Sequence, residues 1–299
     1  MSHPVNEAGF VTLNGAQQWV TLRGDDTANP VLLVLSGPGV AFSALAELFA
    51  PWERRFTLAH WDQPGAGRTA DRHGEDDPLS LERLIADGLA LALQLRGRLP
   101  AAPLIPLGIS GGSIIGLSML ARRPDLFAAY AGQGQIFHWP RQQAASYGLT
   151  LDRLRAAGDA AAVAELLALG PPPWPDVAAD AVWSRHAGTL TAAELAVLTR
   201  LPPPPAGQDP RVRAMTAFAR LRADIAGFDA DDLGRRFERP LLFLQGEADL
   251  YTPTTALETW LADLSAPRQR LAILPGGGHS AVFLTDAMGA GLATLLADL

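Results

Sequence analysis

A serine between two glycines is the part of this sequence best suited to nucleophilic chemistry. Residues 108–112 read Gly-Ile-Ser-Gly-Gly, which has the Gly-x-Ser-x-Gly form of a nucleophile elbow centred on Ser110. Residues 103–107 are apolar and predict a buried strand, and a helical pattern follows the motif. Glycine has no Cβ, so it fits the tight turn that would lift the serine hydroxyl above the sheet edge. An ordinary loop between strand and helix is the alternative, but this setting favours the elbow.

Two residues further along the chain could supply the base and the acid that a nucleophilic serine needs. His279 lies in a glycine-flanked loop that follows a predicted strand. A histidine in such a loop is a poor core residue, so His279 is the predicted base. Asp249 follows another predicted strand and is the predicted acid; Glu247, in the same loop, is interpreted as a solvated charge. The carboxyl ends of parallel strands meet at one sheet edge, so we expect these residues to lie near Ser110.

Backbone N–H groups of two glycines could stabilise the oxyanion that forms when a serine attacks a carbonyl. Gly111 follows the nucleophile at the start of the predicted helix, where unpaired N–H groups and the helix dipole favour negative charge. Gly37 lies in the Ser-Gly-Pro-Gly loop at 36–39, after the strand predicted at 31–35. A rigid turn without a catalytic role is the alternative for this loop.

Composition excludes several classes of function. The chain has 299 residues, 48% hydrophobic and 18% charged, with a formal net charge of −7, which argues against a nucleic-acid surface. It has no cysteine, and its six histidines show no metal-ligand spacing, so we expect neither a metal site nor disulfides. The N-terminus lacks a signal-peptide pattern, and no apolar stretch is long enough to span a membrane. A cytoplasmic protein is the expectation.

The histidines other than the predicted base have weaker signals. His60 lies just before the loop that begins at residue 62 and is interpreted as a structural hydrogen-bond donor. His138 and His186 lie in the middle of the chain and could line a pocket. His3 and His73 are expected on the surface.

Strands alternate with helices in both outer parts of the chain, which predicts a parallel sheet covered on both faces. Asn14-Gly15 separates two strand-like runs and is a strong hairpin signal, and Ser80 is placed to cap a helix. Further predictions place helices at 44–50 and from 281 to the C-terminus, and strands at 56–61, 127–131, 240–244 and 271–274.

The middle hundred residues break the alternation. They are helical and proline-rich, with helix-ending runs at 171–175 and 202–205 and a short helix that Asp159 caps and Gly170 ends. We therefore predict a core domain formed by residues 1–134 and 237–299, interrupted by a helical insertion at 135–236.

Several motifs occur along the chain in a distinctive order and spacing. They are Gln18-Trp19-Val20, Asn29-Pro30-Val31-Leu32-Leu33, Gly37-Pro38-Gly39, Asp62-Gln63-x-Gly65-x-Gly67-Arg68-Thr69, Gly108-x-Ser110-x-Gly112-Ser113, Asp249 and Gly278-His279-Ser280. Together they resemble the proline iminopeptidase-like branch of the α/β-hydrolase superfamily. The resemblance implies the α/β-hydrolase fold, a mostly parallel eight-stranded sheet with the insertion as a helical cap over the site. It also implies hydrolysis through a Ser110–His279–Asp249 triad without a cofactor, and a structural brace formed by Asp62 and Arg68.

The cap carries the candidate substrate-binding residues. In the proline iminopeptidases, as the resemblance implies, cap glutamates anchor the free amine of the substrate. Glu165 is the candidate here, although it could mark the solvent face of its helix, and Asp176 and Asp180 are the alternatives. Trp174 and Trp183 are candidates for lining a hydrophobic pocket or, alternatively, for forming the cap core. Glu194 is explained by a capping box that begins at Thr191.

The predicted function is a serine hydrolase that cleaves a small ester or amide through an acyl-enzyme. An aminopeptidase acting on a free N-terminal residue is the form that the resemblance implies, and a carboxylesterase or lactonase is the alternative. A non-hydrolytic ligand-binding or lyase scaffold is the hypothesis from another class. The expected partner is a small molecule or short peptide, with no nucleic acid and no membrane; nothing indicates an oligomeric state.

Overall fold

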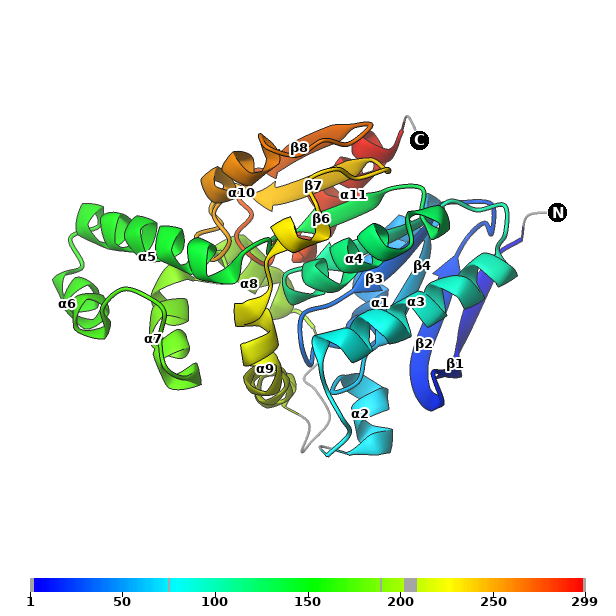
Figure 1. The fold of residues 1–299 in the computed structure, drawn as a ribbon, viewed down its shortest axis with the longest axis horizontal. Helices are drawn as coiled ribbons and strands as arrows, with labels where there is room; N and C mark the ends of the chain where they lie inside the picture. Colours follow the sequence, from blue (N-terminus) through cyan, green and yellow to red (C-terminus); the bar gives the residue numbers. More distant parts are fainter. Residues whose placement is uncertain (1–2, 75, 189, 202–208, 298–299) are drawn as a thin grey trace.

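An eight-stranded sheet forms the centre of the computed structural model, which describes residues 3–74, 76–188, 190–201 and 209–297 (Figure 1). The strands follow the order β1-β2-β4-β3-β5-β6-β7-β8; β1 pairs antiparallel with β2, β2 pairs antiparallel with β4, and the other pairs are parallel. This confirms the predicted mostly parallel sheet. The strands are β1 (Val5–Leu13), β2 (Ala16–Gly24), β3 (Val31–Leu35), β4 (Thr57–Asp62), β5 (Leu104–Ile109), β6 (Tyr130–Gln133), β7 (Leu241–Gly246) and β8 (Gln269–Leu274).

The first two strands form the hairpin that the sequence predicts. Asn14 (φ 46°) and Gly15 (φ 88°) both have the positive φ angles that a two-residue hairpin turn requires. The register pairs Leu13 with Ala16 across this turn.

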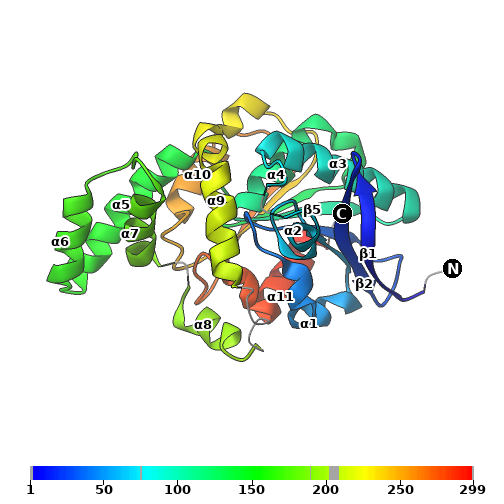
Figure 2. The same ribbon diagram turned by 90° about the horizontal axis from the view of Figure 1, so that it is seen from below.

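The central strands are apolar on both faces because helices cover both sides of the sheet. On β3, Leu33 and Leu35 belong to the core cluster that also contains residues of α3 and α4, whereas Leu32 and Val34 belong to the cluster on the side of α1 and α11. Figure 2 shows α3 and α4 on one side of the sheet and α1 and α11 on the other. The helices flanking the sheet are α1 (Ala46–Phe49), α2 (Gly67–His73), α3 (Leu81–Arg98), α4 (Gly111–Arg122), α10 (Thr254–Leu261) and α11 (Thr285–Leu296).

Some predicted element boundaries differ from the structure. The helix predicted at 44–50 is a short α1 between two 3₁₀ turns, and the helix predicted from 281 begins at Thr285 after a 3₁₀ turn. The strand predicted at 127–131 begins at Tyr130 because Phe127 still belongs to the turn that Pro124 opens. Ser80 caps α3 as predicted, accepting a hydrogen bond from the N–H of Arg83 at 3.2 Å.

Among the described residues, five α-helices lie between β6 and β7, in the interval where the sequence predicts the insertion at 135–236, here called the cap region. Figure 1 shows α5, α6 and α7 extending away from the sheet, with α9 alongside the core. Asp159 caps α6, and Gly170, at φ 75°, follows its end, as predicted. The proline run at 202–205 lies outside the described residues. The helices of the cap region are α5 (Trp139–Ala156), α6 (Ala160–Leu169), α7 (Val177–Ala187), α8 (Ala192–Leu198) and α9 (Pro210–Gly227).

Contacts of the loop after β4 connect the start of α2 to β4 and β2. The Asp62 carboxylate accepts a hydrogen bond from the N–H of Arg68 at 2.9 Å, and the Arg68 guanidinium lies 4.3 Å from the ring centroid of Trp19 on β2. Burial raises the pKa of Asp62. These contacts have the bracing character that the resemblance implies for this loop.

No helix within the described ranges is long and apolar enough to cross a bilayer.

The His60 imidazole is buried on β4, where no described residue forms a hydrogen bond with it. It is 2% exposed, and neither ring nitrogen has a partner among the residues that the structure describes. The interpretation of His60 as a structural donor is therefore wrong. Its ring packs against Phe49, with the ring centroids 5.5 Å apart. Burial, and to a lesser extent the positive charge of Arg23, lowers the pKa of His60 from 6.5 to about 4.

His60 is expected to cost the protein stability as the pH falls from about 6.5 to about 4. The unfolded chain binds a proton at the higher pH and the folded chain only at the lower one, so acid favours the unfolded state. The full shift corresponds to about 3 kcal/mol. Urea unfolding of wild type and His60→Leu at about pH 7 and pH 4.5 should show the smaller loss in the variant. Equal losses in the two proteins would contradict this prediction.

Candidate active site

Ser110 lies on a strained turn between β5 and α4. Its φ of 53° and ψ of −123° are unusual for a residue with a side chain, and such strain is found at functional sites that the surrounding structure over-determines. Its N–H donates to the carbonyl of Gln133 on the neighbouring strand at 2.9 Å. The strand–turn–helix setting predicted for the elbow is therefore present.

The two glycines of the motif are required by close backbone approaches. A Cβ on Gly112 would lie 2.0 Å from the carbonyl oxygen of Leu35, and a Cβ on Gly108 would lie 2.6 Å from the Cα of Ser113. No side chain fits at either position without moving β3 or α4. The Gly-x-Ser-x-Gly spacing thus follows from the close packing of the start of α4 against β3 and β5.

The structure brings the predicted base and acid together with Ser110. His279 Nε2 lies 2.8 Å from Ser110 Oγ, and His279 Nδ1 lies 3.2 Å from an Asp249 carboxylate oxygen. His279 and Asp249 are 6% and 4% exposed. Ser110 follows β5, Asp249 follows β7 and His279 follows β8, so the three residues gather at the carboxyl edge of the sheet. A histidine placed this way can take the serine proton while the carboxylate fixes its tautomer.

The Asp249 carboxylate is surrounded by donors that sequence reasoning missed. One oxygen accepts from the backbone N–H groups of Tyr251 (2.8 Å) and Thr252 (2.9 Å). The other accepts from the Gln245 amide (2.8 Å) and the Thr252 hydroxyl (2.7 Å) in addition to His279. Aspartate side chains often accept hydrogen bonds from backbone N–H groups a few residues further along the chain. Only the bonds from the backbone of Tyr251 and Thr252 could therefore have been expected from the sequence. Glu247, interpreted as a solvated charge, is exposed and accepts from Gly276 N–H at 3.1 Å.

The two predicted oxyanion glycines lie next to each other: Gly37 is in the loop after β3, and Gly111 is the first residue of α4. A Cβ on Gly37 would lie 3.8 Å from the Gly111 nitrogen, and a Cβ on Gly111 would lie 2.6 Å from Pro38 Cδ. The Gly37 loop is closed by a hydrogen bond from Ser36 Oγ to the carbonyl of Val40 at 2.6 Å. A side chain at position 111 would therefore collide with the Gly37 loop.

His279 is also held from its other sides. The Gln133 amide donates to the His279 carbonyl at 2.9 Å, and the Tyr251 ring packs against the imidazole with centroids 4.6 Å apart. Burial raises the pKa of Tyr251, so it remains a neutral phenol here. Tyr251 in turn stacks on Trp183 at 4.5 Å, and Trp174 packs against Trp183 at 5.3 Å.

The candidate substrate-binding residues are divided between two environments. Trp174 and Trp183 are 5% and 0% exposed and belong to the aromatic core of the cap region, which reaches His279 through Tyr251. Glu165 is exposed on α6, where it pairs with Arg185 (2.5 Å) and His186 (2.7 Å) on α7. The hydrogen bond from His186 lowers the pKa of Glu165. Figure 1 shows α6 at the outer end of the cap region, far from the sheet edge that carries the predicted triad.

Three of the remaining histidines, His73, His138 and His186, contact other residues through their ring nitrogens. His138 caps α5 by accepting from Arg141 N–H at 3.2 Å, and His186 contacts Glu165 as described above. His73 contacts the carbonyl of Gln17 at 2.6 Å. No group of three or more His, Cys, Asp or Glu side chains that could hold a metal occurs within the described ranges.

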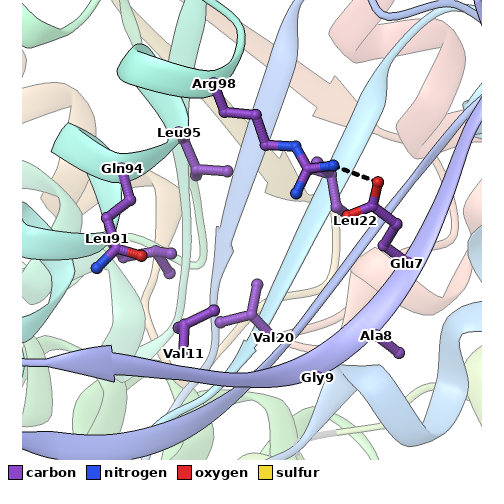
Figure 3. A pocket seen from close by; sticks show the side chains of 10 residues that line it. All are labelled: Glu7, Ala8, Gly9, Val11, Val20, Leu22, Leu91, Gln94, Leu95 and Arg98. Atoms are coloured by element: carbon purple, nitrogen blue, oxygen red, sulfur yellow. Dashed lines mark hydrogen bonds and ion pairs between the residues drawn. The ribbon is translucent and has the colours of Figure 1, made fainter.

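A surface pocket of about 260 Å³ lies away from this site, between the β1–β2 hairpin and α3 (Figure 3). Apolar side chains form its floor, and Glu7 pairs with Arg98 at its rim. None of the predicted site residues lines it. Its lining residues are Glu7, Ala8, Gly9, Val11, Val20, Leu22, Leu91, Gln94, Leu95 and Arg98.

Comparison with curated proteins finds a relative that spans most of the chain. The probable aminopeptidase YbaC of Bacillus subtilis (strain 168) is 25% identical over 292 residues, which cover 90% of this chain and 89% of the relative. No protein-family model matches the chain.

Solved structures resemble this one over nearly its whole length. The proline iminopeptidase-related protein TTHA1809 from Thermus thermophilus has a TM-score of 0.62 at 21% identity, covering 99% of this chain and 100% of its own. The proline iminopeptidase of Mycobacterium smegmatis has a TM-score of 0.62 at 18% identity, covering 98% of both chains. A thermostable carboxyl esterase from Bacillus coagulans has a TM-score of 0.67 at 15% identity, covering 98% of both chains. At these identities the structures show a shared fold.

Proposed function

We propose that this chain, which is 25% identical to a probable aminopeptidase and shares its fold with proline iminopeptidases, is a serine hydrolase that cleaves a small ester or amide through an acyl-enzyme. The observation that carries the proposal is the 2.8 Å contact between Ser110 Oγ and His279 Nε2 on a strained elbow. A serine hydroxyl within hydrogen-bond reach of a histidine is the arrangement that nucleophilic catalysis needs.

The reaction would proceed in two halves. Ser110 Oγ attacks the substrate carbonyl carbon while His279 Nε2 takes the hydroxyl proton, and Asp249 stabilises the imidazolium that forms. The N–H groups of Gly37 and Gly111 bind the oxyanion. The alcohol or amine leaves with the proton from His279, and the acyl group remains on Ser110. Water, deprotonated by His279, then releases the acid and restores the serine.

The substrate class depends on whether the cap region holds a free amine. The relative named a probable aminopeptidase favours a substrate with a free N-terminal residue. Such a substrate carries a cation, which a buried site binds well only if a carboxylate faces it. A cap carboxylate without another partner would therefore support the aminopeptidase form.

The cap carboxylates considered as anchors all have protein partners, which favours a carboxylesterase as the second candidate. Glu165 pairs with Arg185 and His186, and Asp176 caps α7 by accepting from Ala179 N–H at 2.9 Å. Asp180 is 5% exposed and bonds to the side chains of Arg222 (2.6 Å) and Gln143 (3.1 Å). Glu194 accepts from two backbone N–H groups.

A matched pair of substrates tests the proposal. kcat/KM is measured on alanyl or prolyl p-nitroanilide, on the same compound N-acetylated, and on a p-nitrophenyl ester, with Ser110→Ala as the blank. Strong preference for the free amine supports the aminopeptidase form. Turnover of the ester with no preference for the free amine supports the esterase form. If Ser110 reacts with no phosphonate probe and no substrate turns over, the hydrolase proposal fails and a binding scaffold remains.

A further inference from the structure

Glu194 is a fully buried carboxylate that links the cap region to the loop carrying His279. It is 0% exposed, at the first turn of α8. One of its oxygens accepts from Thr191 N–H at 2.7 Å, which completes the predicted capping box. The other accepts from Gly278 N–H at 2.6 Å, across 84 residues of sequence. A capping box alone needs only the first of these bonds, and a buried carboxylate is costly unless donors surround it.

The approach of α8 to this loop is close. A Cβ on Gly278 would lie 3.0 Å from Thr191 Cγ2 and 3.1 Å from Glu194 Oε2. The same helix packs against the 3₁₀ turn at 281–283, directly after the loop. Figure 2 shows α8 set apart from α5–α7, on the side of the molecule where α11 lies. Thus α8 contacts the catalytic loop itself, whereas α5–α7 extend away from the sheet.

The loop needs external support because three glycines in a row precede His279. Glycine permits many backbone conformations, so the position of the imidazole depends on what holds the loop. The Gly277 carbonyl accepts from Ala248 N–H at 2.8 Å, the Gly278 N–H donates to Glu194, and the His279 carbonyl accepts from the Gln133 amide at 2.9 Å. Of these three bonds, the one to Glu194 connects the loop to the cap region, and the other two connect it to residues in or next to the sheet.

We propose that Glu194 is a positioning residue whose carboxylate fixes the Gly278–His279 peptide and so couples the docking of α8 to the alignment of His279 with Ser110. This rests on the proposed role of His279 as the general base. Losing the bond leaves Gly278 N–H buried and unpaired, and the loop relaxes toward other partners. A displacement of about 1 Å at a catalytic group can cost about 10²-fold in rate.

Three substitutions of Glu194 and one matched control test the proposal. Glu194→Ala removes both bonds, Glu194→Asp keeps the charge but shortens the reach, and Glu194→Gln keeps one acceptor oxygen at full length. We expect kcat on a p-nitrophenyl ester to fall about 10- to 100-fold in the first two and less in the third, with KM changed less than about threefold. Thr191→Ala removes the hydroxyl half of the capping box but leaves the Gly278 bond, so it should lower Tm while kcat stays within about twofold.

A second readout does not depend on activity. Hydrogen exchange of the peptide containing residues 276–280 should be faster in the three Glu194 variants than in wild type and Thr191→Ala. Unchanged exchange, a kcat loss in Thr191→Ala as large as in Glu194→Ala, or a change confined to KM would each overturn the proposal. If Glu194→Ala does not fold, the Asp and Gln variants carry the test. If exchange is faster in the Glu194 variants but Ser110→Ala keeps full activity, the proposed function is overturned. The structural role of the Glu194–Gly278 bond would then still be supported.

Discussion

Replacing Ser110 or His279 by alanine is expected to lower kcat by about 10⁴-fold or more while the protein stays folded. Ser110 Oγ would form the acyl bond, and His279, 2.8 Å away, would take and return its proton. Neither side chain belongs to the apolar clusters that hold the sheet and helices together. The measurement is kcat on the best p-nitrophenyl ester, with circular dichroism and Tm as the check on folding.

The double variant and a glycine variant sharpen this test. Because the two residues act as a unit, Ser110→Ala/His279→Ala should be no slower than either single variant. Ser110→Gly should be equally inactive but have a higher Tm than Ser110→Ala, since glycine adopts φ 53° without strain. Rates above about a tenth of wild type in either alanine variant would show that the assignment is wrong.

The parts of the fold that the sequence predicted are those encoded by local patterns. Apolar runs such as 31–35 marked strands buried on both faces, and Asn14-Gly15 marked the hairpin. Boundaries were missed where tertiary contacts decide them. Phe127 looks like a strand residue but is held in a turn, and the predicted C-terminal helix is interrupted at Leu284.

The candidate triad was predictable because each member follows a strand and parallel strands end at one edge. Its supports were not, since they depend on which distant elements meet. Gln133 bonds to the His279 carbonyl across 146 residues, and Glu194 bonds to Gly278 across 84. The capping-box pattern explained only one of the two bonds of Glu194.

His60 shows a further limit of sequence reasoning. A histidine just before a structural loop suggests hydrogen bonding, yet the ring is buried against Phe49 and its nitrogens have no hydrogen-bond partner within the described chain. The strand predicted at 56–61 did not show which groups lie next to each ring nitrogen, because distant elements supply them.

Asp249→Asn is expected to lower kcat by about 10⁴-fold and to destabilise the fold by about 2–4 kcal/mol. One carboxylate oxygen accepts hydrogen bonds from two backbone N–H groups. The other accepts them from His279, from the Gln245 amide and from the Thr252 hydroxyl. An amide has only one acceptor oxygen, so in either orientation its NH₂ group faces donors. The imidazole then loses the partner that sets its tautomer, and buried donors lose their acceptor.

Glu247→Gln is the matched control, because it makes the same chemical change in the same loop at an exposed position. Its kcat and urea midpoint should remain at wild-type values. A variant of Asp249 with more than about a tenth of wild-type kcat, together with a strong loss in Glu247→Gln, would move the acid role to Glu247. If Asp249→Asn loses stability but keeps its kcat, the role of Asp249 is limited to organising its loop. In that case His279 would act as the base through Nε2 without needing a carboxylate to set its tautomer.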